Sequence, residues 1–473
     1  MKLIIPRSEL KEALAGLSKV VNLRAPVPIL SSLRLDAEDQ SVRLTGTSID
    51  QTATYTITVA DPMPSPVSVL VPLAELQTAM RTAQGPNILI ESGKDAVTVT
   101  ATVAGQGIGR RIETPGIADW PVLPDAVETK PVEPGFLAGL RQALAFASTD
   151  DNRPLLKSVL LDVDAKAGHR LVSTDSRRLT VLPCGILPLA ESVIVPSCRF
   201  LNWSRLEGSA QIGAGKGVFT LRCGPWVYTT KVVEGQYPRW SQVVPSYDDA
   251  RTLELSPEDT ELLIKALPSL PTYEGSLDAV VLCLEPDGAR IYSRPDAKAP
   301  ESAIRMEKSK HSGGGAFAIG LNREFFRDAL IAGFRIWEMR DPTSPLLGRI
   351  TKDDKGSVHV LMPIRTIDHE VPRTEAPAAE AKPTPIPVQP QPMKEATMPK
   401  KPEQPQTVAP EAPTSLDRIL SAYELAKDAV RQANTALADV AESVRAAIKE
   451  DRARRKEISD VRAGLARLQA IRV

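Results

Sequence analysis

The sequence has little of what enzymes and metal proteins depend on. Its four histidines, His169, His311, His359 and His369, are scattered and lack the short spacing of metal ligands. It has neither a G-x-S-x-G nucleophile motif nor a P-loop, and its carboxylates form no distinctive pair. These absences argue against catalysis. We therefore expect a protein that is not an enzyme and that has neither a metal nor another cofactor.

Cysteine is also scarce, and long apolar runs are missing. Cys184, Cys198, Cys223 and Cys283 show no C-x-x-C spacing, so we expect them to be reduced or buried. No stretch approaches the roughly 20 apolar residues of a membrane helix. The apolar start, residues 1–5, is too short for a signal peptide. The sequence therefore predicts a soluble, cytoplasmic protein with no membrane partner.

An excess of charge of either sign is absent too. Lys and Arg total 58, as do Asp and Glu, so the net charge of the 473 residues is zero. Proteins that coat nucleic acid electrostatically usually carry a large basic excess. The balance argues against such a protein, but it leaves room for a local basic surface. The length favours about three domains.

Three segments with a helical pattern recur at intervals of roughly 125 residues. Each places apolar residues three or four apart, the one-sided stripe of a half-buried helix. Ser8 and Ser256 are expected to be N-caps, and Pro257 suits a first helical turn. The three segments are residues 7–17, 135–146 and 256–267.

A second kind of segment recurs at the same interval. A short β-rich run leads through a Pro or Gly into an amphipathic helix at residues 68–76, 192–201 and 316–326. Between the two kinds of helix lie alternating stretches rich in Val, Thr and Tyr, such as 42–59 and 218–233, which predict strands. We therefore predict an α+β unit used three times, at residues 1–124, 128–247 and 252–368.

Beyond Arg365 the sequence changes character. Residues 371–414 are dense in Pro, Ala, Glu, Gln and Lys and have no aromatic residue, so we expect a disordered linker. Residues 415–473 place apolar residues three or four apart, from Tyr423 to Leu468, with a charged interruption near Asp451. This pattern favours a coiled-coil helix, either one rod or a hairpin, over a lone solvated helix.

Several segments resemble one known family. They include residues 24–30 (RAPVPIL), 146–154 (FASTDDNRP), 173–179 (STDSRRL), 192–196 (SVIVP), 234–240 (EGQYPRW) and 359–365 (HVLMPIR). In this order and spacing they are similar to the β subunit of bacterial DNA polymerase III, the sliding clamp. The resemblance covers about residues 1–366 and indicates a divergent member of the family with a C-terminal extension.

The resemblance implies three clamp domains per protomer and a head-to-tail homodimer that closes as a ring around double-stranded DNA. Helices would line the hole and meet phosphates without reading sequence. The cations expected to face the DNA are Arg24, Arg81, Arg141, Arg199, Arg205, Lys265 and Arg327. For each of them an ordinary solvated surface cation is an equal alternative.

The resemblance also implies a groove that binds short linear motifs of DNA polymerase, clamp-loader subunits and repair proteins. Its apolar walls would be Leu156, Leu179, Pro245, Val360 and Met362, and its rims Thr174, Ser176, Arg177, Arg178, Pro363 and Arg365. An apolar pocket with a cationic edge suits a peptide with Leu or Phe anchors and a polar Gln. Leu156 and Val360 could equally be plain core residues.

Three departures from the family pattern leave an alternative open. Ser176 and Arg177 follow Thr174-Asp175 where the family usually has Gly and then His or Arg, and Arg110-Arg111 stand in the strand expected to close the ring. The tail leaves from the edge of the groove, where it could tether a coiled-coil partner. The alternative function is therefore a clamp-fold scaffold that does not encircle DNA and assembles partners through its tail.

Overall fold

The computed structural model describes residues 2–364, apart from residues 26, 94–95, 115, 165–167, 273–277, 296–298, 314 and 353–355. All of them belong to one compact unit. Arg365, the predicted linker at 371–414 and the predicted coiled-coil helix at 415–473 lie outside the described residues. Within the described part, no helix is long and apolar enough to cross a membrane.

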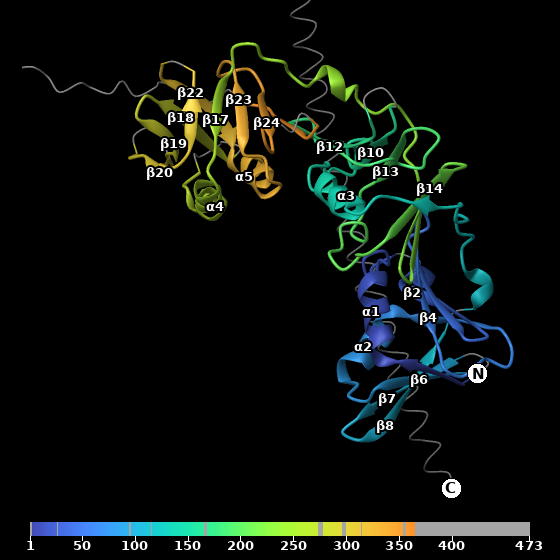
Figure 1. Cartoon of the computed structure of the whole chain (residues 1–473). Helices are drawn as coiled ribbons and strands as arrows, with labels where there is room; N and C mark the ends of the chain where they lie inside the picture. Colours follow the sequence, from blue (N-terminus) through green and yellow to red (C-terminus); the bar gives the residue numbers. More distant parts are fainter. Residues whose placement is uncertain are drawn as a thin grey trace, which may run out of the picture. The chain divides into compact units, whose positions relative to one another are not determined.

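The described residues form five α-helices, all in segments where the sequence predicts one (Figure 1). The hydroxyl of Ser256 accepts the N–H of Asp259 at 3.0 Å and caps the helix that begins at Pro257, as predicted. The prediction of Ser8 as a cap is wrong, because the first helix already begins at Arg7. The helices are α1 (Arg7–Leu17), α2 (Leu73–Thr82), α3 (Phe136–Leu144), α4 (Pro257–Ala266) and α5 (Arg323–Ile331).

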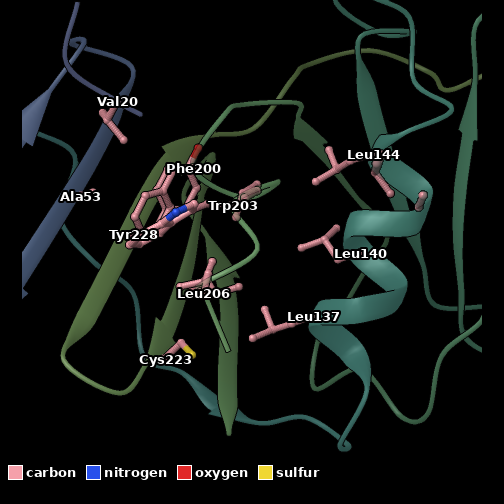
Figure 2. Close-up of a cluster of buried hydrophobic side chains, with 14 of the residues drawn as sticks. Val20, Ala53, Leu137, Leu140, Leu144, Phe200, Trp203, Leu206, Cys223 and Tyr228 are labelled. Atoms are coloured by element: carbon pink, nitrogen blue, oxygen red, sulfur yellow. The ribbon is translucent and has the colours of Figure 1, made fainter. Parts of the chain in front are cut away.

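The helix predicted after Pro196 is wrong, because residues 197–207 form successive turns. The N–H of Trp203 bonds to the carbonyl of Phe200, and that of Leu206 to the carbonyl of Trp203, both at 3.1 Å. These large apolar residues stand three apart, which matches the repeat of such turns better than the 3.6 residues of an α-helix. They still reach the core, and Figure 2 shows them in one cluster with Leu137 of α3.

The strands form four antiparallel sheets. The eight-stranded sheet runs β5 (Val67–Pro72), β2 (Ser32–Glu38), β3 (Ser41–Thr47), β4 (Gln51–Thr58), β16 (Trp226–Lys231), β15 (Val218–Cys223), β14 (Ala210–Gly215), β9 (Lys130–Pro131). The nine-stranded sheet runs β13 (Val193–Pro196), β10 (Ser158–Asp162), β11 (Arg170–Thr174), β12 (Arg178–Pro183), β25 (Val358–Leu361), β24 (Leu346–Arg349), β23 (Ile336–Met339), β17 (Arg251–Glu254), β21 (Lys310–Ser312).

The two smaller sheets have four strands each. One runs β1 (Lys2–Pro6), β6 (Asn87–Ser92), β7 (Ala96–Val103), β8 (Gln106–Glu113), and the other runs β20 (Ser302–Met306), β19 (Gly288–Ser293), β18 (Ala279–Glu285), β22 (Phe317–Asn322). Each large sheet contains a meander of three consecutive strands, β2-β3-β4 in one and β10-β11-β12 in the other. The last strand of each meander pairs with a strand from a later part of the chain: β4 with β16, and β12 with β25. The corresponding strands of the small sheets, β8 and β20, are edges.

Aromatic side chains fill the junction between β4 and β16. The rings of Tyr55 and Trp226 lie 4.6 Å apart, and Trp203 meets Trp226 edge-on at 5.6 Å. Helix α1 approaches the same tryptophan so closely that a Cβ at Gly16 would lie 2.3 Å from its ring. Glycine is therefore required at this position of the helix.

His359 lies at the junction between β12 and β25, where it pairs with Thr180. It is fully buried among Phe146, Phe334 and Trp337, and its Nδ1 lies 2.7 Å from the hydroxyl of Thr180. Its Nε2 has no hydrogen-bond partner among the described residues. Burial, and then the nearby positive charge of Arg178, lowers the pKa of His359 to about 3. The imidazole is thus neutral in the folded protein at physiological pH.

This burial predicts a sensitivity to acid. The unfolded chain takes up the proton near pH 6.5 and the folded protein only near pH 3, so stability is lost as the pH falls through this window. The histidine contributes a slope of up to about 1.4 kcal/mol per pH unit. His359→Gln, which cannot titrate, should flatten the pH dependence of the free energy of unfolding, measured with urea. Equal slopes for this variant and the unaltered chain would contradict the prediction.

Candidate functional site

A tight turn carries the predicted groove residues from β11 to β12. The hydroxyl of Thr174 donates to the carbonyl of Arg178 at 2.6 Å and accepts the N–H of Ser176 at 3.1 Å. Ser176 has a φ of +77°, a region that favours glycine. The turn from β3 to β4 has the same pattern at Thr47 and Ile49, whose φ is also +77°. The conformation therefore belongs to the repeated fold, and Ser176 adopts it at some cost in strain.

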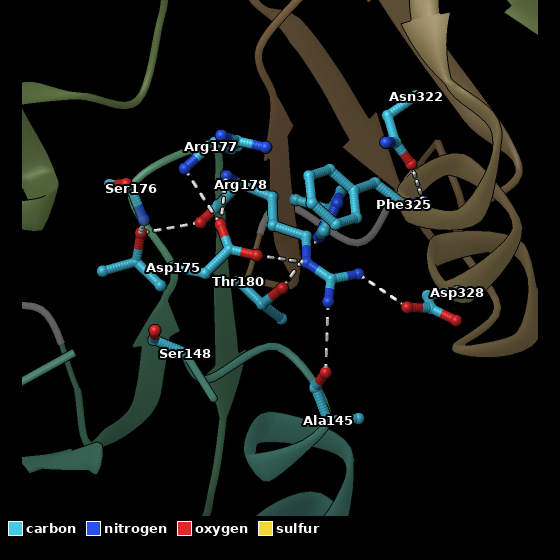
Figure 3. Close-up of polar contacts among 12 residues, drawn as sticks. Ala145, Ser148, Asp175, Ser176, Arg177, Arg178, Thr180, Asn322, Phe325 and Asp328 are labelled. Carbon is cyan, nitrogen blue, oxygen red and sulfur yellow. Dashed lines mark hydrogen bonds and ion pairs between the residues drawn. The ribbon is translucent and has the colours of Figure 1, made fainter. Parts of the chain in front are cut away.

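Arg178 is buried rather than placed on an open rim (Figure 3). Its Nε donates to Asp175 at 2.9 Å, one terminal nitrogen to Asp328 of α5 at 2.7 Å, and the other to the carbonyl of Ala145 at 3.4 Å. The guanidinium also lies 4.3 Å from the ring centre of Phe325. Its donors are thus engaged within the chain, and the residue joins the turn to α5. The exposed cation of this turn is Arg177.

An apolar cluster lies beneath the turn. Leu179 of β12 pairs directly with Val360 of β25, and both are buried. The N–H of Met362 donates to the carbonyl of Arg177 at 2.9 Å, which continues the contact beyond the end of β25. The cluster consists of Leu160, Val172, Leu179, Val181, Ile194, Leu347, Val358 and Val360, with Leu155, Val233, Tyr237, Trp240, Val244 and Tyr247 packed against it.

The part of this surface that a ligand can reach is smaller than the predicted set. Met362 is 38% exposed, and Leu156, Pro245 and Pro363 are half-buried, whereas Leu179 and Val360 form the floor. Two further neighbours were not predicted from the sequence. Leu155 rather than Leu156 packs on the cluster, which the Leu-Leu pair alone could not decide, and Val244 packs against it as well.

Most of the cations predicted to face DNA have partners within the chain. Lys265 pairs with Glu261 at 2.5 Å, Arg205 with Glu12 at 3.1 Å, and Arg141 donates to the carbonyl of Leu206 at 2.9 Å. Arg327 donates to the carbonyl of Ile264 at 2.9 Å and lies 3.9 Å from Glu324. Arg24, Arg81 and Arg199 are exposed. The five helices carry seven Lys or Arg and eight Asp or Glu, so their surfaces are close to neutral.

Comparison with known proteins gives one consistent result. Residues 1–116 match the family model for the N-terminal domain of the DNA polymerase III beta subunit. The chain is 27% identical over 396 residues to the beta sliding clamp of Caulobacter vibrioides, covering 77% of this chain and 100% of that protein. It is 24% identical over 270 residues to the beta sliding clamp of Escherichia coli K12, covering 53% of this chain and 69% of that one.

The chain therefore resembles the β sliding clamp family and is a divergent relative of its members. Solved sliding clamps share its fold. That of Pseudomonas aeruginosa gives a TM-score of 0.65 at 22% identity and that of Bacillus subtilis 0.66 at 18%, covering 77% and 78% of this chain and 100% of each of those chains. The β sliding clamps are non-catalytic processivity factors, and this homology supports a DNA sliding clamp rather than an enzyme.

Arg178 is expected to stabilise the junction between β12 and α5. Arg178→Met removes the charge and keeps much of the volume, but leaves the half-buried carboxylate of Asp175 without the guanidinium that pairs with it. We expect a loss of about 3 kcal/mol in the free energy of unfolding, measured with urea. The neighbouring change Arg177→Met, on an exposed side chain, should change it by no more than about 0.5 kcal/mol. Equal effects of the two changes would contradict this role.

Proposed function

We propose that this protein closes with a second copy, head to tail, into a ring around duplex DNA in the cytoplasm. The ring holds DNA polymerase, clamp-loader subunits and repair proteins at the surface formed by Thr174–Leu179, Pro245 and residues 360–365. Each copy contributes clamp domains at 1–124, 128–247 and 252–368. The observation that carries this proposal is that β8 and β20, the last strands of their meanders, are edges among the described residues, whereas β4, β12, β16 and β25 are paired.

The repeated strand pairings give the register in which these edges would meet. Across the small sheet, Ile5 lies opposite Ile88, Ile88 opposite Ala101, and Ala101 opposite Ile108. Across the large sheet, the same succession of neighbours leads from Val132 to Ala210, then to Cys223 and then to Trp226. Ile5 and Val132 stand five residues before Leu10 and Leu137, the first leucines buried on the next helix. Ile108 of β8 therefore corresponds to Trp226.

The partner strand is placed in the same way. Leu35 lies opposite Leu44 on the next strand, and Leu44 lies opposite Tyr55. In the same way, Leu282 lies opposite Ile291, and Ile291 lies opposite Ile304. Leu35 and Leu282 pair with Val69 and Ile319, each three residues before the cap of the next helix. Ile304 of β20 therefore corresponds to Tyr55.

Since Tyr55 pairs with Trp226 inside the chain, Ile304 would pair with Ile108 of the second copy. The same register sets Arg111 opposite Glu301, so an apolar pair and an ion pair both support it. Arg110, which stands beside Arg111 in the predicted closing strand, already binds Glu75 of its own chain at 2.8 Å. Glu301 already binds Arg290 at 2.6 Å, and Arg111 would be a further cation beside it.

The near-neutral helices suit a protein held on DNA by topology, because strong phosphate contacts would slow its sliding. The same neutrality also favours the second candidate, a clamp-fold scaffold that assembles partners through its tail and does not encircle DNA. Retention on circular DNA separates the two functions.

We expect the protein, loaded by a clamp-loading complex with ATP, to stay on a nicked circular plasmid through gel filtration at high salt. Cutting the plasmid once should release it, because a ring slides off a free end while phosphate contacts are unchanged. Release by the cut supports encirclement. Loss at high salt from the circle itself, or retention on the cut DNA, would favour the scaffold.

Partner binding should depend on Met362. A peptide with Leu and Phe anchors and a Gln would insert its apolar side chains beside this exposed residue. Met362→Lys should weaken binding of a fluorescent peptide of this kind at least tenfold, about 1.4 kcal/mol, measured by anisotropy.

The matched control is Ile186→Lys, on another exposed apolar residue outside the predicted groove. It should bind the peptide as the unaltered chain does. Equal affinities of the Met362 variant and this control would refute the predicted groove.

A further inference from the structure

A concave pocket lies where β17 leads into α4. Four cationic side chains from three segments of the chain line it: Lys308, Lys310, Arg335 and Lys352. Among the described residues its one acidic lining residue is Glu254, and Leu255, Ser256, Pro257, Ile336, Ile350 and Thr351 complete the lining. The pocket therefore carries an excess of positive charge, unlike the helix surfaces.

The sheet holds these cations around Glu254. Lys310 is its cross-strand neighbour on β21, and Arg335 precedes Ile336, its neighbour on β23. The Nζ of Lys352 lies 2.7 Å from the carboxylate. The hydrogen bond from Lys352, together with the charges of Lys352, Lys310 and Arg335, lowers the pKa of Glu254. The single carboxylate of Glu254 thus lies near three cations, Lys310, Arg335 and Lys352.

Two of the cations have no acidic partner of their own. Among the described residues neither Lys310 nor Arg335 forms an ion pair, whereas Lys352 pairs with Glu254, and Lys308 lies 3.9 Å from Glu258. The carboxylate of Asp259 is buried and accepts the backbone N–H of Lys308 at 2.9 Å, so it holds the wall in place. Residues 353–355, which follow Lys352, lie outside the described residues.

We infer that this pocket binds the phosphodiester backbone of DNA through Lys310 and Arg335, with Lys308 and Lys352 at its sides. No aromatic side chain among the described residues lines it, so it offers no surface on which a base could stack, and recognition would be limited to phosphate. Such binding is independent of sequence. The inference rests on the proposed function and adds a source of phosphate binding that the paired cations of the helices do not supply.

The test compares full-length variants by anisotropy with a fluorescent 12-base-pair duplex, which is short and linear, so retention by a closed ring plays no part. For Lys310→Gln combined with Arg335→Gln, the slope of log affinity against log salt should fall in magnitude by about 2, roughly 1 for each phosphate that the variant no longer neutralises. The matched control, Lys231→Gln, removes a cation that pairs with Asp50 and lies outside both the pocket and the cations expected to face DNA, so it should leave the slope unchanged. Unchanged thermal unfolding of both variants shows that the fold is intact.

Three results would each contradict DNA binding by this pocket. They are an unchanged slope in the double variant, an equal fall of the slope in the control, and no binding of the duplex by the unaltered chain. These results are separate from the plasmid assay. Retention on the circular plasmid with an unaffected slope would contradict DNA binding by the pocket and support the ring. A reduced slope without retention on the circular plasmid would support DNA binding by the pocket and contradict encirclement.

Discussion

The antiparallel pairing of β12 with β25 is the contact on which the candidate site depends. It joins strands that are far apart in the sequence and sets Leu179 beside Val360 as an apolar floor. Its continuation from Arg177 to Met362 brings the exposed Met362 side chain to that floor. Arg178 then ties the same junction to Asp328 of α5. Since one pairing determines floor and rim, a defect in it would disturb both together.

This junction is maintained at a cost in stability. Ser176 has a backbone conformation that a residue with a side chain adopts at about 1 kcal/mol or more. His359 is buried in its neutral form with one ring nitrogen unpartnered among the described residues, and Arg178 is withdrawn from water among Phe146, Phe325 and two carboxylates. Hydrogen bonds to the turn and apolar packing offset these costs. The matching turn at Ile49 shows that the geometry is a property of the repeat.

Periodicity and resemblance together predicted the five helices, the strand-rich segments between them and the family. These predictions failed where contacts between distant parts of the chain, rather than the local sequence pattern, determine the structure. The segment 197–207 has the apolar residues of a helix, but Phe200, Trp203 and Leu206 are spaced for turns. The burial of Arg178 and the partner of Arg110 depend on contacts with α5 and α2, which no local pattern reveals. The pocket around Glu254 gathers residues from separate strands and was equally invisible in the sequence.

The measurement that tests the central claim most directly is a disulfide between copies. Tyr55 and Trp226, the pair that Ile304 and Ile108 would reproduce, stand directly opposite each other, a separation that a disulfide can span. An equal mixture of Ile108→Cys and Ile304→Cys chains, oxidised mildly, should give a covalent dimer that neither variant forms alone. Failure of the mixture to crosslink, or crosslinking of one variant by itself, would contradict ring closure through β8 and β20.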